Sequence, residues 1–262
     1  QIHSVAGKLE RGDTLISTRP FRSPHHTISD VALIGGGAHL QPGEVSLAHN
    51  GVLFLDEFPE YSKNALETLR QPLEDRQISI SRARYNVTLP CSFMLVAAMN
   101  PCPCGYYNDP HHPCTCRPGQ VQRYMSRISG PLLDRIDLQV EVVPVSVREL
   151  SSAPAGESSA AIRARVVAAR RRQAARFADC PGVHCNAQMA ARHIKAFVQL
   201  DESAHAALEQ ALERLGLSAR AYERVLKVSL TLADLDGVDQ ITRTHIAEAI
   251  SYRNLDRASW GE

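Results

Sequence analysis

Two acidic side chains, Asp56 and Glu57, directly follow the short apolar run Val52–Leu55 in the segment GVLFLDE. An apolar strand that ends in an acidic pair has the form of a Walker B motif. In such a motif the aspartate lies near the Mg²⁺ of a bound nucleotide, and the glutamate orients or deprotonates the attacking water. The pattern therefore predicts nucleotide hydrolysis, although an acidic pair after a buried strand could equally cap a helix.

A second polar residue, Asn100, follows the apolar run Phe93–Met99. In open α/β sheets, ligands bind beyond the carboxyl ends of the strands. If the two apolar runs are neighbouring strands, the amide of Asn100 could position the same water molecule. Taken alone, Asn100 would be an ordinary turn residue, but two polar strand ends strengthen each other's interpretation.

Four of the seven cysteines form two closely spaced pairs: Cys102, Cys104, Cys114 and Cys116. Four thiolates are enough for a closed tetrahedral structural zinc site, with His111 and His112 as reserve ligands. The alternative is free thiols or redox pairs. Because no export signal precedes the cysteines, metal is favoured over disulfides. The other three are expected to be buried or loop thiols: Cys91, Cys180 and Cys185.

Basic side chains are concentrated in two places. Residues 77–81 alternate as QISIS and residues 87–89 continue the alternation, which predicts a β-hairpin with a basic tip. The charged tip could instead protect the edge of the hairpin from association. Six arginines and no acidic residues lie between Arg163 and Arg176. That run predicts either a solvated helix or a contact with DNA or another subunit.

The elements that must position these residues divide the chain into two parts. Val52–Leu55 and Phe93–Met99 are predicted to be strands buried on both faces of a parallel sheet, with a third core strand at Asp137–Val143. Residues 151–262 are predicted to be helical, with helices capped by Asp201, Ser218 and Thr242. Thirteen of the fifteen prolines lie before residue 151. We therefore expect an α/β domain at 1–150 and a helical domain at 151–262.

Composition excludes several classes of protein. With 44% hydrophobic and 22% charged residues, the chain is expected to be globular rather than disordered. No apolar run reaches 18 residues and no leader is visible, so we expect a cytoplasmic protein without a membrane span. The net charge of +1 does not by itself indicate a partner.

Several local sequences together resemble the ComM/YifB group of magnesium-chelatase-like AAA+ ATPases, which are related to the MCM helicases: GVLFLDEFPE, LRQPLEDRQISISRA, AAMNPCPCG, SGPLLDRIDL and RPFRSPHH. The resemblance covers nearly the whole chain. It implies an AAA+ P-loop-type parallel sheet followed by an all-α lid. It further implies a hexameric ring that binds ATP between subunits and moves on branched or single-stranded DNA, as a branch-migration motor in recombination and natural transformation.

The resemblance also implies roles for individual residues. Asp56 and Glu57 would be the Walker B pair and Asn100 would be sensor 1. Arg135 matches an arginine finger that reaches the γ-phosphate held by a neighbouring subunit. The alternative for Arg135 is a salt bridge with Asp134 or Asp137. Arg220, in the first turn of a predicted helix, matches the sensor 2 arginine.

The predicted hairpin resembles the presensor-1 hairpin that faces the pore of such rings. Arg82 and Arg84 would then contact DNA phosphates without reading the base sequence. His25 and His26, in the segment RPFRSPHHT, are expected to have a local role in a loop.

One motif of the family does not occur in this sequence, the phosphate-binding GxxxxGK[ST]. The resemblance places it upstream, so we expect the chain to be a C-terminal portion that is inactive by itself and incomplete in its sheet. Two alternatives to a DNA motor remain open. One is a magnesium-chelatase-type motor subunit that remodels a protein partner without binding DNA, and the other is a non-catalytic assembly module stabilised by zinc.

Overall fold

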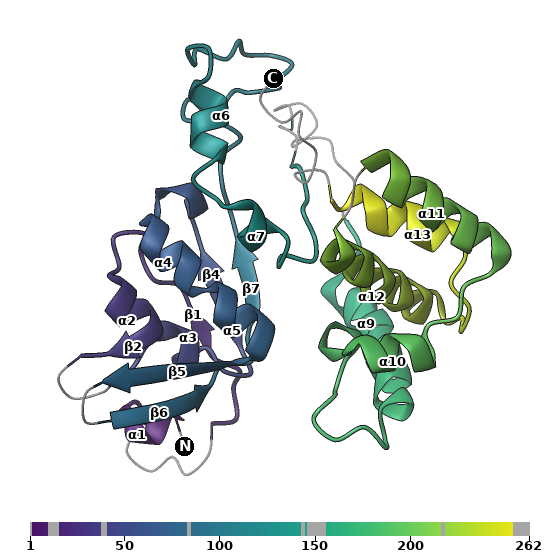
Figure 1. Ribbon diagram of the computed structural model, residues 1–262, viewed down its shortest axis with the longest axis horizontal. Coiled ribbons are helices and arrows are strands. Elements are labelled where there is room, and N and C mark those ends of the chain that lie inside the picture. The colour runs from purple at the N-terminus through teal and green to yellow at the C-terminus, as the bar shows by residue number, and fades with distance from the viewer. Residues whose placement is uncertain are drawn as a thin grey trace. The chain divides into compact units, whose positions relative to one another are not determined.

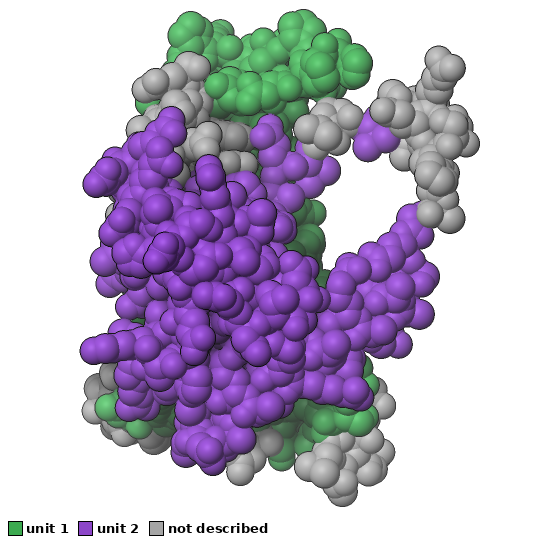
Figure 2. All heavy atoms as spheres, turned by 90° about the vertical axis from the view of Figure 1, so that its right-hand side faces the viewer, with its two compact units in different colours: residues 1–136, 259–262 green, residues 137–258 purple. Residues whose placement is uncertain are grey.

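The computed structural model describes residues 2–9, 16–37, 41–82, 85–142, 145, 156–215 and 218–253. The chain divides into two compact units, residues 1–136 and residues 137–258 (Figures 1 and 2). Unit 1 mixes strands and short helices, and the described elements of unit 2 are helices. The predicted order, an α/β part with a parallel sheet followed by a helical part, is confirmed. Among the described residues, no helix has the length and apolar character needed to cross a bilayer.

Unit 1 contains short elements. They are α1 (Ile2–Val5), β1 (Phe21–Arg22), α2 (Asp30–Ile34), β2 (Gly35–Gly36), β3 (Gln41–Pro42), α3 (Glu44–Leu47), β4 (Val52–Leu55), the 3-10 helix η1 (Phe58–Glu60), α4 (Lys63–Thr68), α5 (Arg70–Asp75), β5 (Gln77–Arg82), β6 (Tyr85–Pro90), β7 (Met94–Ala97), α6 (Gln120–Met125) and α7 (Gly130–Leu133). The Ser62 side chain caps α4 by accepting a hydrogen bond from the Ala65 N–H at 3.1 Å.

A parallel sheet with strand order β1-β4-β7 forms the centre of unit 1. Its register pairs Val52 with Met94 and Leu55 with Ala97. At the other end of β4, Gly51 lets the two backbones approach closely, because a Cβ there would lie 2.0 Å from the carbonyl oxygen of Pro20. The two predicted core strands are therefore neighbours, and their carboxyl ends lie at the same edge of the sheet.

Among the described residues, the two faces of this sheet are covered to different extents. Leu53 and Leu55 are fully buried, in a core that also contains Leu66 and Leu69 from the α4 region, and α4 and α5 lie over that face (Figure 1). On the opposite face, Met94 is 60% exposed. The prediction that both strands are buried on both faces is thus wrong for β7, because an apolar run does not itself supply the layer that would cover its second face.

The predicted hairpin is confirmed, with β5 and β6 paired antiparallel from Gln77↔Pro90 to Arg82↔Tyr85. Its inward residues Ile78 and Ile80 are buried. The predicted third core strand is not formed over residues 137–142. In that segment the Gln139 N–H donates to the Tyr252 carbonyl at 2.7 Å, and Val140 and Val142 are exposed. Within the described residues, this bond joins the segment to the end of a helix and not to a strand.

Unit 2 is a helical bundle. Its elements are α9 (Ser159–Arg176), the 3-10 helix η2 (Asn186–Gln188), α10 (Ala191–Phe197), α11 (Glu202–Leu215), α12 (Ala219–Asp236) and α13 (Arg243–Ser251). The predicted cap residues Asp201, Ser218 and Thr242 directly precede the last three of these helices. Fully buried side chains from α12, α13 and the preceding segment fill the core. At the predicted boundary between the two domains, residues 151–155 lie outside the described residues.

Candidate functional site

The carboxyl ends of β4 and β7 bring the predicted catalytic residues to one edge of the sheet. The Ala98 N–H donates to the Leu55 carbonyl at 2.9 Å, and the Phe58 N–H donates to the Ala98 carbonyl at 3.0 Å. These bonds join the chain on both sides of the acidic pair to the end of β7. Asp56, Glu57 and Asn100 are all exposed there, so a ligand at this edge could reach them.

The backbone of Glu57 is held in an unusual conformation. Its φ of 51° and ψ of 44° lie in the left-handed region, which residues other than glycine, asparagine and aspartate seldom adopt. Its N–H donates to Asp56 Oδ1 at 2.8 Å, and its carbonyl accepts from the Glu60 N–H at 2.7 Å. The turn after β4 is therefore closed by its own residues, and it fixes the point from which the Glu57 side chain leaves.

His26, which was expected to have a local role in a loop, contacts Glu57. His26 Nδ1 lies 2.7 Å from Glu57 Oε2. The histidine follows β1, whose parallel pairing with β4 brings residues 23–26 to the same edge as the acidic pair. The contact could have been predicted only by recognising Phe21–Arg22 as a strand next to Val52–Leu55. A strand of two residues shows no periodicity, so the sequence gives no sign of it.

Tyr61 fastens the histidine segment to the turn. Its hydroxyl donates to the Pro24 carbonyl at 2.5 Å. Burial, followed by the negative charges of Asp56 and Glu57, raises the pKa of Tyr61 to about 12. The phenol therefore stays protonated and remains a hydrogen-bond donor across the physiological pH range.

The four clustered cysteines converge. The four Sγ atoms all lie within 4.8 Å of one another, and they belong to Cys102, Cys104, Cys114 and Cys116. The distances from Cys102 Sγ to the sulfurs of Cys104 and Cys114 are 3.3 and 3.8 Å. Sulfurs about 3.8 Å apart are what a tetrahedral site with Zn–S bonds of about 2.3 Å requires. The cluster could therefore hold a metal ion.

The two histidines of this loop are not part of the cluster. Backbone N–H groups of His111 and His112 donate to Asp109 Oδ1 at 2.7 and 3.0 Å, and the His112 ring lies 5.1 Å from that of Tyr106. Asp109 thereby closes the turn between the two cysteine pairs. Four sulfur ligands complete a tetrahedral set, so the reserve ligands are not needed.

Arg135 is nearly buried and is held within unit 1. Its side chain is 7% exposed, Nη1 donates to the Pro131 carbonyl at 2.6 Å, and Nη2 pairs with Glu74. Asp137, one of the two partners considered from the sequence, forms an ion pair with Arg224. As an arginine finger, Arg135 would have to exchange Glu74 for a phosphate.

The other predicted residues lie apart from these. Arg82 is the last residue of β5, and Arg84 lies outside the described residues. Arg220 is exposed in the first turn of α12, in unit 2. Cys91 is buried, and burial raises the pKa of its thiol to about 12.

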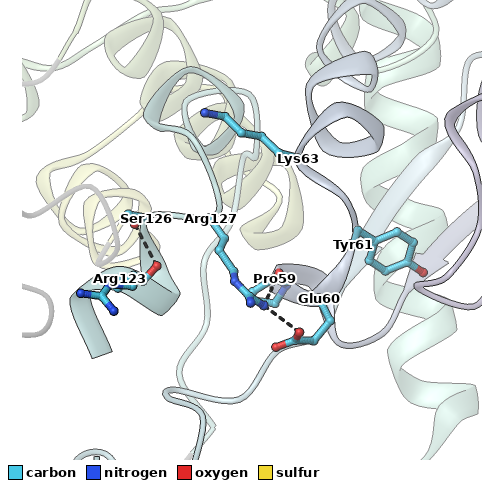
Figure 3. Close-up of a pocket in the computed structure, with 7 residues that line it drawn as sticks. All are labelled: Pro59, Glu60, Tyr61, Lys63, Arg123, Ser126 and Arg127. Atoms are coloured by element: carbon cyan, nitrogen blue, oxygen red, sulfur yellow. Dashed lines mark hydrogen bonds and ion pairs between the residues drawn. The ribbon is translucent and has the colours of Figure 1, made fainter. Parts of the chain in front are cut away.

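A pocket adjoins η1 and α6 in unit 1. Figure 3 shows Arg127 turned toward Glu60, whose carboxylate accepts a hydrogen bond from Nη1 at 2.7 Å. The side chains of Lys63 and Arg123 point in other directions (Figure 3). These three cations do not converge, so the pocket does not form an anion site.

Three arginines of the α9 run form ion pairs within unit 2. Arg176 donates to both carboxylate oxygens of Asp234, whose side chain is fully buried, and Arg172 approaches the same carboxylate at 3.6 Å. Arg165 pairs with Glu157. This helix is therefore an ion-paired structural element, closer to the predicted solvated helix than to a continuous basic surface.

Two family profiles cover most of the chain. Residues 1–150 match the family described as magnesium chelatase, subunit ChlI, and residues 156–253 match the family of the C-terminal part of that subunit.

Among curated relatives, the chain is 50% identical to the uncharacterized protein YifB of Escherichia coli K12 over 241 residues, 91% of this chain and 46% of that protein. It is 47% identical to the competence protein ComM of Haemophilus influenzae over 240 residues, again 91% of the chain and 46% of the relative. A shorter similarity, 30% over 104 residues, links 40% of the chain to 14% of the probable DNA helicase MCM9 of Arabidopsis thaliana. The chain thus spans about half the length of the bacterial relatives that it matches.

Proposed function

This chain belongs to the magnesium chelatase subunit ChlI family, and on that premise we propose that it is part of an AAA+ ATPase that moves on DNA. The proposed whole is a ring hexamer of the ComM type, acting in recombination and natural transformation. ATP would bind between its subunits.

The observation that carries the ATPase proposal is the common edge formed by β4 and β7. Asp56 would hold Mg²⁺, for which exposed carboxylate oxygens are suitable ligands. Glu57 would accept a proton from the attacking water, and the amide of Asn100 would orient that water. When bound, MgATP supplies the phosphoryl group and the divalent charge that stabilises its transfer.

Two arginines would complete the site. Arg135 would contact the γ-phosphate held by a neighbouring subunit after leaving Glu74, because a planar cation stabilises the charge of the transferring phosphoryl group. Arg220 would contact nucleotide from the helical unit, either in its own subunit or across the interface.

The proposal that the protein moves on DNA is supported by the antiparallel hairpin β5–β6, whose first strand ends at Arg82. In a ring, Arg82 and Arg84 would contact phosphates. The names of two relatives, a competence protein and a probable DNA helicase, point in the same direction. We further propose that the four-cysteine cluster holds a structural zinc ion that ties residues 101–116 into a compact loop.

A second candidate function is a magnesium-chelatase-type motor subunit that remodels a protein partner without binding DNA, and the match to the magnesium chelatase subunit ChlI family keeps it open. The two are separated by one experiment on the full-length protein. ATP turnover is measured with and without forked or four-way junction DNA. Stimulation by DNA is expected, whereas normal basal turnover without stimulation would contradict DNA translocation and favour the second candidate.

A further inference from the structure

The segment after β1 presents an anchored imidazole to Glu57. His26 Nδ1 is 2.7 Å from Glu57 Oε2. Because an ionised carboxylate offers only acceptors, the imidazole N–H is the donor in this contact. Within the described part of the chain, no other side chain forms an ion pair or hydrogen bond with the Glu57 carboxylate. Its orientation therefore depends on His26.

The His26 ring is itself held from two sides. The His25 ring lies with its centroid 4.1 Å away, and the Tyr61 ring meets it edge-on at 6.4 Å. The Tyr61 hydroxyl bonds the Pro24 carbonyl, and the Nδ1 of His25 bonds the Thr27 hydroxyl at 3.0 Å. The side chain of His26 is 28% exposed. These contacts make it an anchored ring rather than a freely moving surface group.

Glu57, by contrast, has a fixed backbone and an otherwise free side chain. Its side chain is 55% exposed, and among the described residues the bond to His26 is the contact that restrains its rotation. A general base works best when its reactive oxygen is already placed, because a base that must be oriented in the transition state loses rate to entropy. One oxygen bound to His26 leaves the other oxygen to face a substrate.

We propose that His26 is a positioning residue for Glu57, fixing one carboxylate oxygen so that the other accepts the proton of the attacking water. The arrangement follows the general pattern in which a base is oriented by a third group. This inference rests on the proposed function, in which Glu57 is the base of an ATPase.

The test uses the full-length protein and steady-state ATP hydrolysis. His26→Phe keeps an aromatic ring between His25 and Tyr61 and removes the N–H donor. We expect kcat to fall by about tenfold or more, as when an outer partner of an active-site group is lost, with KM and ATP affinity unchanged. The matched control is His205→Phe, which removes the imidazole of an exposed histidine–glutamate pair of α11 and no contact of Glu57, and it should keep the wild-type kcat. His26→Gln, which restores an N–H donor, should recover part of the rate.

Each outcome is decisive. Wild-type or increased kcat in His26→Phe, with ATP binding intact, overturns the positioning role. Equal losses in His26→Phe and His205→Phe also overturn it, because they would not depend on the contact with Glu57. Glu57→Gln separates this inference from its premise: if that variant still turns over ATP, the proposed role of Glu57 is wrong. If Glu57→Gln is inactive but His26→Phe is not, only the role of His26 is wrong.

Discussion

Arg135 pairs with Glu74, which lies 61 residues earlier in the chain, while its second amino group donates to the Pro131 carbonyl. The arginine side chain is 7% exposed and the glutamate 46%. A nearly buried guanidinium needs an acceptor of this kind. The ion pair therefore holds the Arg135 side chain within unit 1. If Arg135 is to contact a nucleotide bound by a neighbouring subunit, its ion pair with Glu74 must break.

Substituting Glu74 and Arg135 separately distinguishes the structural role of the ion pair from the proposed catalytic role of Arg135. Glu74→Ala is expected to lower the free energy of unfolding by about 1–3 kcal/mol, because a buried donor loses its acceptor, while ATP turnover by the full-length protein persists. Arg135→Ala is expected to lower turnover by about 10³–10⁵-fold. Urea denaturation and an ATPase assay measure the two effects. Glu157→Ala, which removes the exposed partner of Arg165, is the control and should cost at most about 1 kcal/mol. Full turnover in Arg135→Ala would rule out an arginine finger.

The hairpin arginines are expected to contact phosphates. Replacing both Arg82 and Arg84 by alanine should weaken DNA binding by the full-length protein and lower the slope of log affinity against log salt by about 2, since each phosphate contact releases counterions. Fluorescence anisotropy over a salt series measures both. A charge-matched control, Arg214→Ala with Arg243→Ala, removes two exposed arginines of unit 2. An unchanged slope in the hairpin variant would exclude the hairpin from the DNA contact.

The cysteine cluster is expected to carry zinc. Protein purified without added metal should contain about one zinc per chain, since four thiolates make one closed site. Cys114→Ser should lose the metal and melt at a lower temperature, because metal binding contributes to folding. Cys180→Ser, which replaces a free thiol outside the cluster, should retain the zinc and the wild-type melting temperature. Elemental analysis and thermal denaturation are the measurements, and metal-free wild-type protein with an unchanged melting temperature after zinc addition would contradict the site.

Cys91 is expected to make the protein less stable in alkali. Burial, followed by the charge of Asp75, raises the pKa of its thiol to about 12 in the folded state, whereas an unfolded cysteine titrates near about 8.5. Below the unfolded value both states are protonated and stability is unaffected. Above it the unfolded state alone loses its proton, so the free energy of unfolding falls as pH rises toward about 12. Urea denaturation at several alkaline pH values measures this fall, and Cys91→Ala should make it shallower. An identical pH dependence in that variant would show that Cys91 is not responsible.

Asp234 is expected to be the most sensitive acid of unit 2. Its side chain is fully buried and is bound by Arg176 and by the Asn186 amide. Asp234→Ala should therefore cost about 3–5 kcal/mol, because the arginine would be left without its partner in the interior. Asp239→Ala is the natural comparison, since Asp239 also pairs with an arginine of α9 but is 91% exposed, and it should cost at most about 1 kcal/mol. Equal losses in urea denaturation would show that burial does not set the strength of these pairs.

Structural features that depend on a few consecutive residues could be predicted from the sequence. The run Val52–Leu55 followed by Asp56 marked a strand and its polar end, and the alternation from Gln77 marked the hairpin. The spacing of the cysteines marked a cluster, which the sulfur positions bear out. The same local reasoning failed for residues 137–142, because the residues of a segment show that it can be a strand but not that a neighbour is present to pair with it.

The sequence by itself determined the strand β4, the hairpin and the helix caps, since periodicity and capping act over a few residues. Only the tertiary structure decided which face of the sheet is covered, that His26 holds Glu57, and that Glu74 holds Arg135. These contacts join residues far apart in the chain. Their partners are selected by strand order and packing, and neither leaves a spacing pattern that the sequence could show.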